Sequence, residues 1–238
     1  VFSSPYPDPA WRIPFLHSLF ENASAVASGV EAAYKALKKG PVNIIAQGGD
    51  GSTADIGFQS ISGMFERGHN VLYVCYDNEG YMNTGTQRSS ATPLFAWTTT
   101  TPVMQPKENP KKDIMAIMAD HHIPYAATAT IAYPEDLIRK LEKAKGIRGT
   151  RFIHLFSPCP PGWKMPSEQT IKISRLAVRS RLFPLYEIEN GRNYTIQEEH
   201  RVVPVKEYLK LQGRFSHLTE KDIEITQRNV DDTWERLL

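Results

Sequence analysis

The chain has 238 residues, 41% of them hydrophobic and 23% charged, with a formal net charge of +2 at pH 7. This length and hydrophobic content allow a substantial core in one large domain, or in one domain with an appendage. The near-neutral charge gives no reason to expect nucleic acid or a membrane surface as a partner, and no run approaches the roughly 18 apolar residues of a membrane-spanning helix. Two cysteines exclude a disulfide framework, so a cytoplasmic location is the default expectation.

The N-terminal region carries no targeting signal and leads into a helix. Residues 1–14 are rich in proline and aromatic residues, which predicts an extended lead-in, and they lack the charged and apolar regions of a signal peptide. The sequence does not begin with Met, so we expect processing, truncation or a missing segment before Val1. Apolar residues then recur at helical spacing from Ser18 to Leu37. The small residues of this helix favour either tight core packing or close approach to a ligand.

A strand–loop–helix–strand unit follows. The apolar run Val42–Ala46 predicts a buried strand, a helix is expected to begin near Ser52, and residues 71–76 predict a second strand. Two polar clusters, residues 48–52 and 77–78, therefore stand at the carboxyl ends of neighbouring strands. Ligands of open α/β sheets bind at this position.

The residue types at these strand ends suggest two kinds of ligand. The pattern Gly-x-Gly-x-x-Ala from Gly49 to Ala54 is compatible with a dinucleotide site in which Asp77 binds the ribose. Against this, Asp50 lies between glycines, where its carboxylate would repel a pyrophosphate unless a divalent cation lay between them. Mg²⁺ prefers octahedral oxygen ligands and is usually held by one or two protein groups plus substrate phosphates. Asp50, the side-chain oxygen of Asn78 and a nearby main-chain carbonyl would form such a site, and the glycines would let the backbone approach a diphosphate.

The middle of the chain predicts the remainder of an α/β fold. Residues 83–101 form a long polar loop of a kind that is usually functional or disordered, and residues 107–112 form a charged, proline-containing link. The alternation of elements after this link predicts a mostly parallel sheet with helices on both faces. His154 is expected to be a satisfied core histidine rather than a metal ligand. The expected elements are helices at 114–121 and 135–145 and strands at 125–130 and 151–156.

A proline-rich loop, Ser157–Trp163, follows the last parallel strand and holds Cys159 on a stiff backbone. From spacing alone, Cys159 is either a small buried hydrophobic residue or a functional thiol. Cys75 lies inside an apolar strand and is expected to be part of the core.

The C-terminal part predicts a separate group of elements. Arg175, Arg179 and Arg181 form either a solvated basic face or a surface for an acidic partner. We expect residues 1–190 to form a cofactor-binding domain and residues 191–238 to form a C-terminal hairpin and helical arm. The expected elements are a helix at 167–182 with a start resembling a capping box, a hairpin around Asn190-Gly191, and helices at 205–211 and 219–238.

Four sequence blocks, in this order, resemble the β subunit of pyruvate:ferredoxin oxidoreductases (pyruvate synthases) in the 2-oxoacid:ferredoxin oxidoreductase family. Gly-Asp-Gly followed by Asn is by itself the pattern of thiamine diphosphate enzymes, and the similarity covers nearly the whole chain. The blocks are Gly-Gly-Asp-Gly at 48–51, Tyr-Asp-Asn-Glu-Gly-Tyr-Met-Asn-Thr-Gly at 76–85, Gln-Arg-Ser-Ser-Ala-Thr-Pro at 87–93 and Ser-Pro-Cys-Pro-Pro-Gly-Trp at 157–163.

The resemblance implies a thiamine diphosphate-binding fold and indicates which residues would bind the metal and the cofactor. Asp50, Asn78 and the main-chain carbonyl of Gly80 would hold Mg²⁺. Asn83 would be a catalytic residue beside the reacting end of the cofactor. The further cofactor-binding residues that the resemblance implies are Gly49, Gly51, Ser52, Glu79, Tyr81 and Met82.

Cys159 matches, by the same resemblance, a cysteine that ligates a 4Fe-4S cluster near the thiamine. Such clusters normally need four thiolates. The family's other three ligands come from a Cys-x-x-Cys and a Thr-Gly-Cys that precede residue 1, and this sequence has neither. We therefore expect either a missing N-terminal segment or an absent cluster.

The resemblance also implies a reaction and its partners. The family oxidatively decarboxylates pyruvate, or a related 2-oxoacid such as oxalate, passes electrons to iron–sulfur clusters and ferredoxin, and transfers the acyl group to coenzyme A. The implied partners are an α subunit with the pyrimidine-binding domain and ferredoxin-like γ and δ subunits. Two alternatives stay open: a non-redox thiamine diphosphate-dependent decarboxylase or carboligase subunit, and a dinucleotide-binding module.

Overall fold

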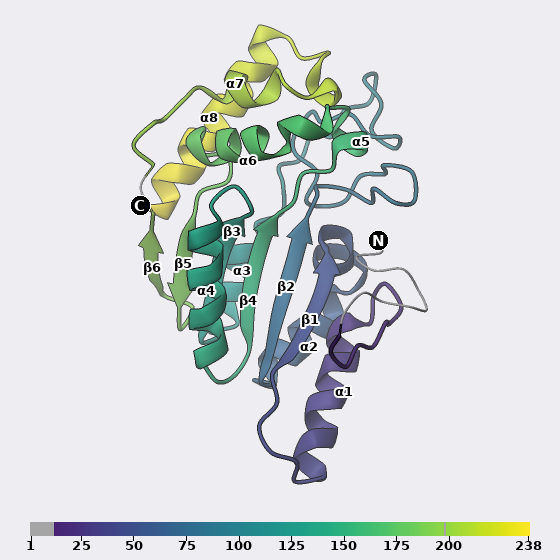
Figure 1. Ribbon diagram of the computed structural model, residues 1–238. Helices are drawn as coiled ribbons and strands as arrows, with labels where there is room; N and C mark the ends of the chain where they lie inside the picture. The colour runs from purple at the N-terminus through teal and green to yellow at the C-terminus, as the bar shows by residue number, and fades with distance from the viewer. Residues whose placement is uncertain (1–11, 198) are drawn as a thin grey trace.

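A computed structural model describes residues 12–197 and 199–238 as an α/β fold around one six-stranded sheet (Figure 1). The strands are β1 (Ile44–Gly49), β2 (Val71–Asp77), β3 (Tyr125–Thr130), β4 (Arg151–Phe156), β5 (Tyr186–Glu189) and β6 (Asn193–Ile196). Their order is β1-β2-β4-β3-β5-β6, with β1 to β4 parallel and β5 and β6 antiparallel. The mostly parallel sheet expected from the sequence is confirmed.

Eight α-helices are seen in the described residues, together with one π-helical turn and two 3-10 turns. Within the same residues, no helix combines the length and the apolar character needed to cross a membrane. The α-helices are α1 (Ala23–Ala36), α2 (Phe58–Glu66), α3 (Ile114–Asp120), α4 (Pro134–Gly146), α5 (Pro160–Trp163), α6 (Thr170–Arg179), α7 (Val205–Leu209) and α8 (Glu220–Leu237). A π-helical turn spans Ser52–Ile56, and 3-10 turns span Ser167–Gln169 and Gly213–Phe215.

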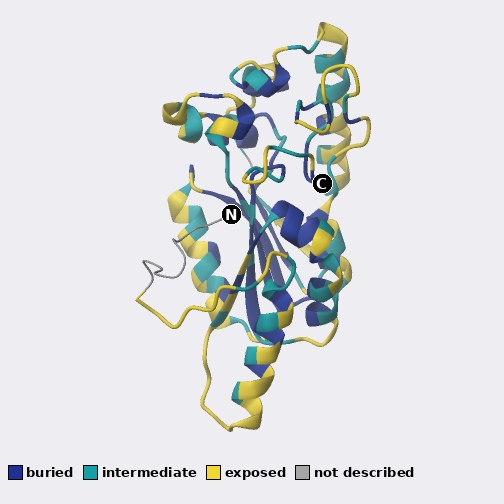
Figure 2. Ribbon diagram, turned by 90° about the vertical axis from the view of Figure 1, so that its right-hand side faces the viewer, coloured by how far each residue is buried: buried dark blue, intermediate teal, exposed yellow. Residues whose placement is uncertain are grey.

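Helices cover both faces of the sheet because side chains alternate along its central strands. In β2, Val71, Tyr73 and Cys75 point into a core shared with α2 and α3. Leu72 and Val74 point to the opposite face, where they belong to a cluster that includes residues of α4. Figure 2 accordingly shows a buried sheet between helical layers.

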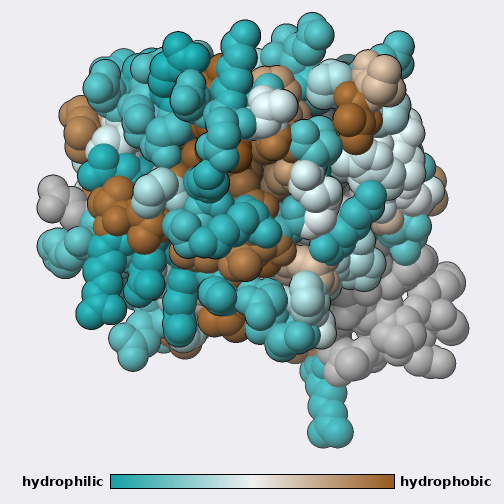
Figure 3. Space-filling view, turned by 90° about the horizontal axis from the view of Figure 1, so that it is seen from above, coloured by the Kyte–Doolittle hydropathy of each residue, from teal (hydrophilic) through white to brown (hydrophobic). Residues whose placement is uncertain are grey.

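The C-terminal helices lie over the carboxyl ends of the parallel strands, toward which the strand arrows point in Figure 1. α6, α7 and α8 enclose a separate core that also contains Trp163 of α5. Seen from this end in Figure 3, the surface is largely hydrophilic, with hydrophobic groups between the polar side chains. The C-terminal elements therefore cap the end of the sheet at which ligands of this fold class bind.

One expected helix begins later than its sequence pattern indicates. Apolar spacing predicts a helix from Ser18, but α1 begins at Ala23. The residues before α1 instead pass the glycine-rich turn, where the hydroxyl of Ser52 donates to the carbonyl oxygen of Phe20. A tertiary hydrogen bond thus replaces the first turn of the expected helix.

The expected helix at 167–182 is shorter and has a different start. It begins with a 3-10 turn, becomes α-helical at Thr170 and ends at Arg179, and no side chain caps it. A capping box instead begins α8, where the side chains of Thr219 and Asp222 each accept a backbone N–H of the other. The expected capping box at the start of the 167–182 helix is therefore wrong.

The basic face expected on this helix is partly occupied by its own chain. The guanidinium of Arg181 lies 4.5 Å from the ring centroid of Trp234, and Arg179 Nε lies 4.0 Å from a carboxylate oxygen of Glu199. Arg175 is exposed. The expected domain division after residue 190 falls in the turn of the β5–β6 hairpin and stays a prediction.

Candidate functional site

Asp50 stands where β1 ends and the chain turns toward α2, and its side chain is almost completely buried. The hydroxyl of Ser89 donates to Asp50 Oδ2 at 2.5 Å. Burial, and then the negative charge of Asp77, raise the pKa of Asp50 well above its usual value. A cation placed beside such a carboxylate would stabilise its ionised form.

The amide group of Asn78 lies between Asp50 and the main-chain carbonyl of Gly80. One end of the amide lies 3.0 Å from Asp50 Oδ1 and 2.7 Å from the Gly80 carbonyl oxygen. With the amide nitrogen at that end, it donates to both oxygens. With the amide oxygen there, three oxygens converge, and only a cation between them offsets their repulsion. The three groups expected to hold Mg²⁺ are thus brought together, and their donor set fits that ion.

Two of the glycines in the turn are required by contact with tyrosine side chains. A Cβ on Gly48 would lie 2.3 Å from the hydroxyl oxygen of Tyr73, and a Cβ on Gly51 would lie 2.5 Å from the ring of Tyr81. At Gly49 the nearest heavy atom would be 3.7 Å away, so this position has space for a Cβ. No contact within the protein therefore requires glycine at position 49. A backbone without a side chain there would allow the close approach of a phosphate group.

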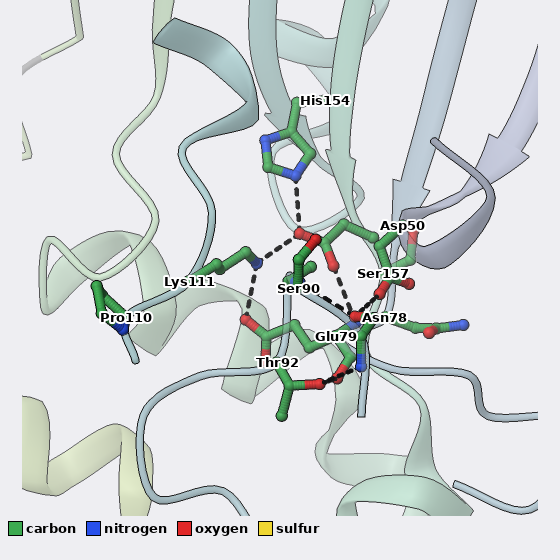
Figure 4. A network of polar contacts seen from close by, with 12 residues as sticks. Asp50, Asn78, Glu79, Ser90, Thr92, Pro110, Lys111, His154 and Ser157 are labelled. Carbon is green, nitrogen blue, oxygen red and sulfur yellow. Dashed lines mark hydrogen bonds and ion pairs between the residues drawn. The ribbon is translucent and has the colours of Figure 1, made fainter. Parts of the chain in front are cut away.

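A buried charge network surrounds Asn78. Its neighbours Asp77 and Glu79 are both fully buried. Lys111 Nζ lies 2.5 Å from Asp77 Oδ2 and 3.0 Å from Glu79 Oε1, and His154 Nε2 lies 2.7 Å from Asp77 Oδ2 (Figure 4). Burial opposes the ionisation of Asp77, but Lys111 and His154 outweigh burial and hold the pKa of Asp77 well below its usual range.

This network bears on two expectations from the sequence. The expectation that His154 is a satisfied histidine is confirmed, since it pairs with Asp77. The dinucleotide alternative needed Asp77 to bind a ribose, but its side chain is sealed from solvent by its partners. Glu79 faces the same interior network, so its side chain does not reach the surface of the site.

Two residues from the second half of the chain contact this loop. Trp163 Nε1 donates to the carbonyl oxygen of Asn78 at 2.8 Å. Arg214 donates to Glu79 Oε2 at 2.5 Å, and its guanidinium lies 3.8 Å from the ring centroid of Trp163. The sequence predicted neither contact, because no local pattern marks a pair so distant in the chain.

The charged link at 107–112 is part of the site's support. Lys107 Nζ donates to the carbonyl oxygens of Thr92 at 2.5 Å, Pro110 at 3.1 Å and Ser90 at 3.4 Å. Burial, and then the positive charge of Arg88, lower the pKa of Lys107 to about 8. The loop that carries Ser89 is therefore held in place by a buried ammonium group.

The structure places Asn83 on an exposed turn and Met82 beside the Cys159 loop. The turn is closed by backbone hydrogen bonds between Tyr81 and Gln87. A Cβ on Gly162 would lie 2.2 Å from Met82 Sδ and 3.4 Å from Cys159 Sγ, so these side chains meet around that glycine. The turn that follows the Asn78 loop and the proline-rich loop are consequently neighbours.

The two cysteines differ sharply in their surroundings. Cys75 is buried in the core, as expected, and burial followed by the charge of Asp77 raises the pKa of its thiol well above the usual value. Cys159 is half-buried. Among residues 12–197 and 199–238, no group of three or more His, Cys, Asp or Glu side chains is arranged to hold a metal ion. The described residues therefore offer one accessible thiol.

Comparisons with known proteins show which proteins this chain is similar to. Residues 2–155 match the family model of the thiamine pyrophosphate enzyme C-terminal TPP-binding domain. Pyruvate synthase subunit PorB of Methanocaldococcus jannaschii is 54% identical over 98% of this chain and 81% of its own length. Ketoisovalerate oxidoreductase subunit VorB of Pyrococcus abyssi is 51% identical over 100% of this chain and 79% of its own length.

A solved structure is similar as well. It is the 2-oxoglutarate:ferredoxin oxidoreductase from Magnetococcus marinus with 2-oxoglutarate, coenzyme A and succinyl-CoA bound. The match has a TM-score of 0.55 and 26% identity, and it covers 59% of this chain and 46% of that one. Sequence and fold therefore point to the same group of proteins.

Proposed function

This chain belongs to the 2-oxoacid:ferredoxin oxidoreductase family, and we propose that it is the subunit that binds the diphosphate of thiamine diphosphate through Mg²⁺. The observation that carries the proposal is the convergence of the Asn78 amide on Asp50 Oδ1 and the Gly80 carbonyl oxygen. One carboxylate, one amide oxygen and one carbonyl oxygen leave coordination positions for phosphate oxygens and water, as Mg²⁺ requires.

The diphosphate would lie along the backbone from Gly49 to Ser52. Gly49 adds no side chain to this stretch of backbone, and the N-terminus of the following helical segment favours negative charge. The hydroxyl of Ser52 is engaged with the carbonyl oxygen of Phe20, so Ser52 would offer its backbone N–H. Tyr81 covers the Gly51 side of this turn and fixes its shape.

Bound thiamine diphosphate supplies the carbanion chemistry that removes CO₂ from a 2-oxoacid. The residues of this chain bind and orient it. The exposed turn with Asn83 would stand beside the reacting end of the cofactor, and Met82 would separate this turn from the proline-rich loop. The proposed substrate is pyruvate or a related 2-oxoacid such as oxalate, with coenzyme A accepting the acyl group.

Electron transfer would use the half-buried thiol of Cys159 as one ligand of a 4Fe-4S cluster. The described residues offer no further accessible thiolate, so the other ligands would come from residues that this sequence does not contain. We propose an α subunit with the pyrimidine-binding domain and ferredoxin-like γ and δ subunits as partners.

Cofactor titration of the intact complex tests the binding proposal. We expect thiamine diphosphate to bind only in the presence of Mg²⁺, and we expect Asp50→Ala to abolish this binding. A nicotinamide dinucleotide that binds without metal would instead support the dinucleotide alternative. Full 2-oxoacid turnover by a complex that lacks iron would favour the non-redox alternative. Iron analysis and electron paramagnetic resonance would check that the complex contains no cluster.

A further inference from the structure

A short C-terminal segment, residues 212–215, is seated directly on the turn that contains Trp163. The backbone N–H of Gly213 donates to the carbonyl oxygen of Lys164 at 3.0 Å, and a Cβ on Gly213 would lie 2.7 Å from Lys164 Cβ. This close approach brings Arg214 into the interior, where its side chain is almost completely buried. The segment lies outside the range 2–155 that matches the thiamine pyrophosphate-binding family model.

Arg214 completes the neutralisation of a fully buried carboxylate. Glu79 Oε1 faces Lys111 and Glu79 Oε2 faces Arg214, so each oxygen has its own cation. Arg214 is itself fixed, because its Nε donates to Gln212 Oε1 at 2.9 Å and its NH2 donates to the hydroxyl of Tyr208 at 3.3 Å. Water does not reach Glu79, so no solvent replaces this cation when it is removed.

The same guanidinium acts on the residue before Glu79. It stacks on Trp163 at 3.8 Å, and Trp163 Nε1 donates to the carbonyl oxygen of Asn78. Glu79 has a φ of +65°, a conformation that is uncommon outside glycine and persists only when surrounding contacts enforce it. Asp77 and Thr92 also bind the backbone of Glu79. Arg214 thus contacts two of the side chains that hold the backbone from Asn78 to Gly80.

We propose that Arg214 is a positioning residue for the metal and diphosphate site. It holds the backbone from Asn78 to Gly80 so that the Asn78 amide meets both Asp50 and the Gly80 carbonyl oxygen, and it makes cofactor binding depend on the C-terminal cap. Arg214 does not touch the cofactor in this proposal, which rests on the proposed function.

The test uses the intact complex, freed of cofactor by chelation and then titrated with Mg²⁺ at a fixed concentration of thiamine diphosphate in a calorimeter. We expect Arg214→Met to raise the apparent Kd for Mg²⁺ by about 10–100-fold, as loss of an outer-sphere partner typically does. Arg214→Lys should recover part of this loss, because it keeps the charge but not the planar, stacked geometry. Val230→Ala, which alters the same C-terminal core away from the loop, should leave the Kd unchanged.

Equal Kd values for Arg214→Met and the wild type would overturn the inference, and so would equal losses in Arg214→Met and Val230→Ala. If Arg214→Met does not assemble, Trp163→Phe removes the donor to Asn78 and reduces the ring on which Arg214 stacks, and an unchanged Kd in that variant overturns the inference too. A wild-type complex that binds no thiamine diphosphate with Mg²⁺ rejects the proposed function together with the inference. Normal wild-type binding with an unaffected Arg214→Met rejects the inference alone.

Discussion

Lys111 Nζ lies 2.5 Å from Asp77 Oδ2, and this contact places a cation directly behind the loop that presents Asn78. Asp77 is fully buried, whereas a quarter of the Lys111 side chain is exposed. The negative charge of Asp77 is one cause of the raised pKa of Asp50. Lys111 compensates this charge. Lys111 therefore contributes both to folding and to the electrostatics of the site.

Removal of this cation is expected to destabilise the protein strongly. Lys111→Met leaves Asp77 and Glu79 buried with less compensation, and breaking a buried ion pair in this way costs about 3–5 kcal/mol. The measurement is heat denaturation of the assembled complex. Lys145→Met, an exposed position on α4, serves as the matched control and should change the melting temperature little. Equal melting temperatures for the two variants would contradict the structural role of Lys111.

Hydrophobic pattern predicted the central strands of the sheet well because they are buried on both faces and therefore read as apolar runs. The expected strands at 125–130 and 151–156 coincide with β3 and β4. The polar strand ends at Asp50 and Asn78 meet as predicted, because parallel neighbouring strands end at the same edge of a sheet.

The support of the site could not be predicted in the same way. The link at 107–112 has the composition of a solvated loop, yet Lys107 and Lys111 are drawn inside by carbonyl and carboxylate oxygens that only the folded chain assembles. Arg214 meets Glu79 across a long separation in sequence. Nothing near either residue in the chain encodes that pairing, because a buried ion pair leaves no periodic signal.

Gly49 and Gly51 should respond differently to replacement by alanine. Gly49→Ala has space in the protein, because its Cβ would lie 3.7 Å from the nearest heavy atom, so it should leave the melting temperature unchanged. It should weaken thiamine diphosphate binding, since it adds a methyl group to the backbone along which the diphosphate is proposed to lie. Gly51→Ala collides with the ring of Tyr81 and should lower both. Calorimetric titration and thermal denaturation of both variants check this. Full cofactor affinity in Gly49→Ala would show that the diphosphate lies elsewhere.

Glu187 should make the protein acid-sensitive at a place remote from the site. Burial opposes its ionisation, but Lys143, Arg139 and Tyr125 outweigh burial and lower the pKa of Glu187 from 4.5 to about 2. Because the folded-state pKa is the lower one, the stabilisation is fully present above about pH 4.5 and is lost as the pH falls towards 2. It amounts to at most roughly 3 kcal/mol.

Denaturation of the wild type and of Glu187→Gln at a series of pH values measures this contribution. The wild type should be the more stable protein at neutral pH, and the two curves should approach each other as the pH falls from about 4.5 towards 2. Parallel curves across this range would mean that the carboxyl group is not stabilised by its partners. Binding of thiamine diphosphate at neutral pH should differ little between them.

The two cysteines provide a matched pair for the iron–sulfur proposal. Cys159→Ser should lower the iron content of the complex and remove the corresponding cluster signal in electron paramagnetic resonance. Cys75→Ala changes a core thiol and should leave the iron content unaltered, apart from a modest loss of stability. Unchanged iron in Cys159→Ser would assign all cluster ligands to other residues.

Asn78→Asp distinguishes a metal site from a structural hydrogen bond with a nearly isosteric change. The replaced end of the side chain lies 3.0 Å from Asp50 Oδ1, so two carboxylates would face each other there. Without a cation their repulsion should lower the melting temperature in the presence of a chelator. Mg²⁺ should reverse the loss, because it binds between the oxygens, and the variant should therefore gain more stability from Mg²⁺ than the wild type does. If the amide of Asn78 serves only as a hydrogen-bond donor to Asp50 and Gly80, the loss in Asn78→Asp persists at every Mg²⁺ concentration.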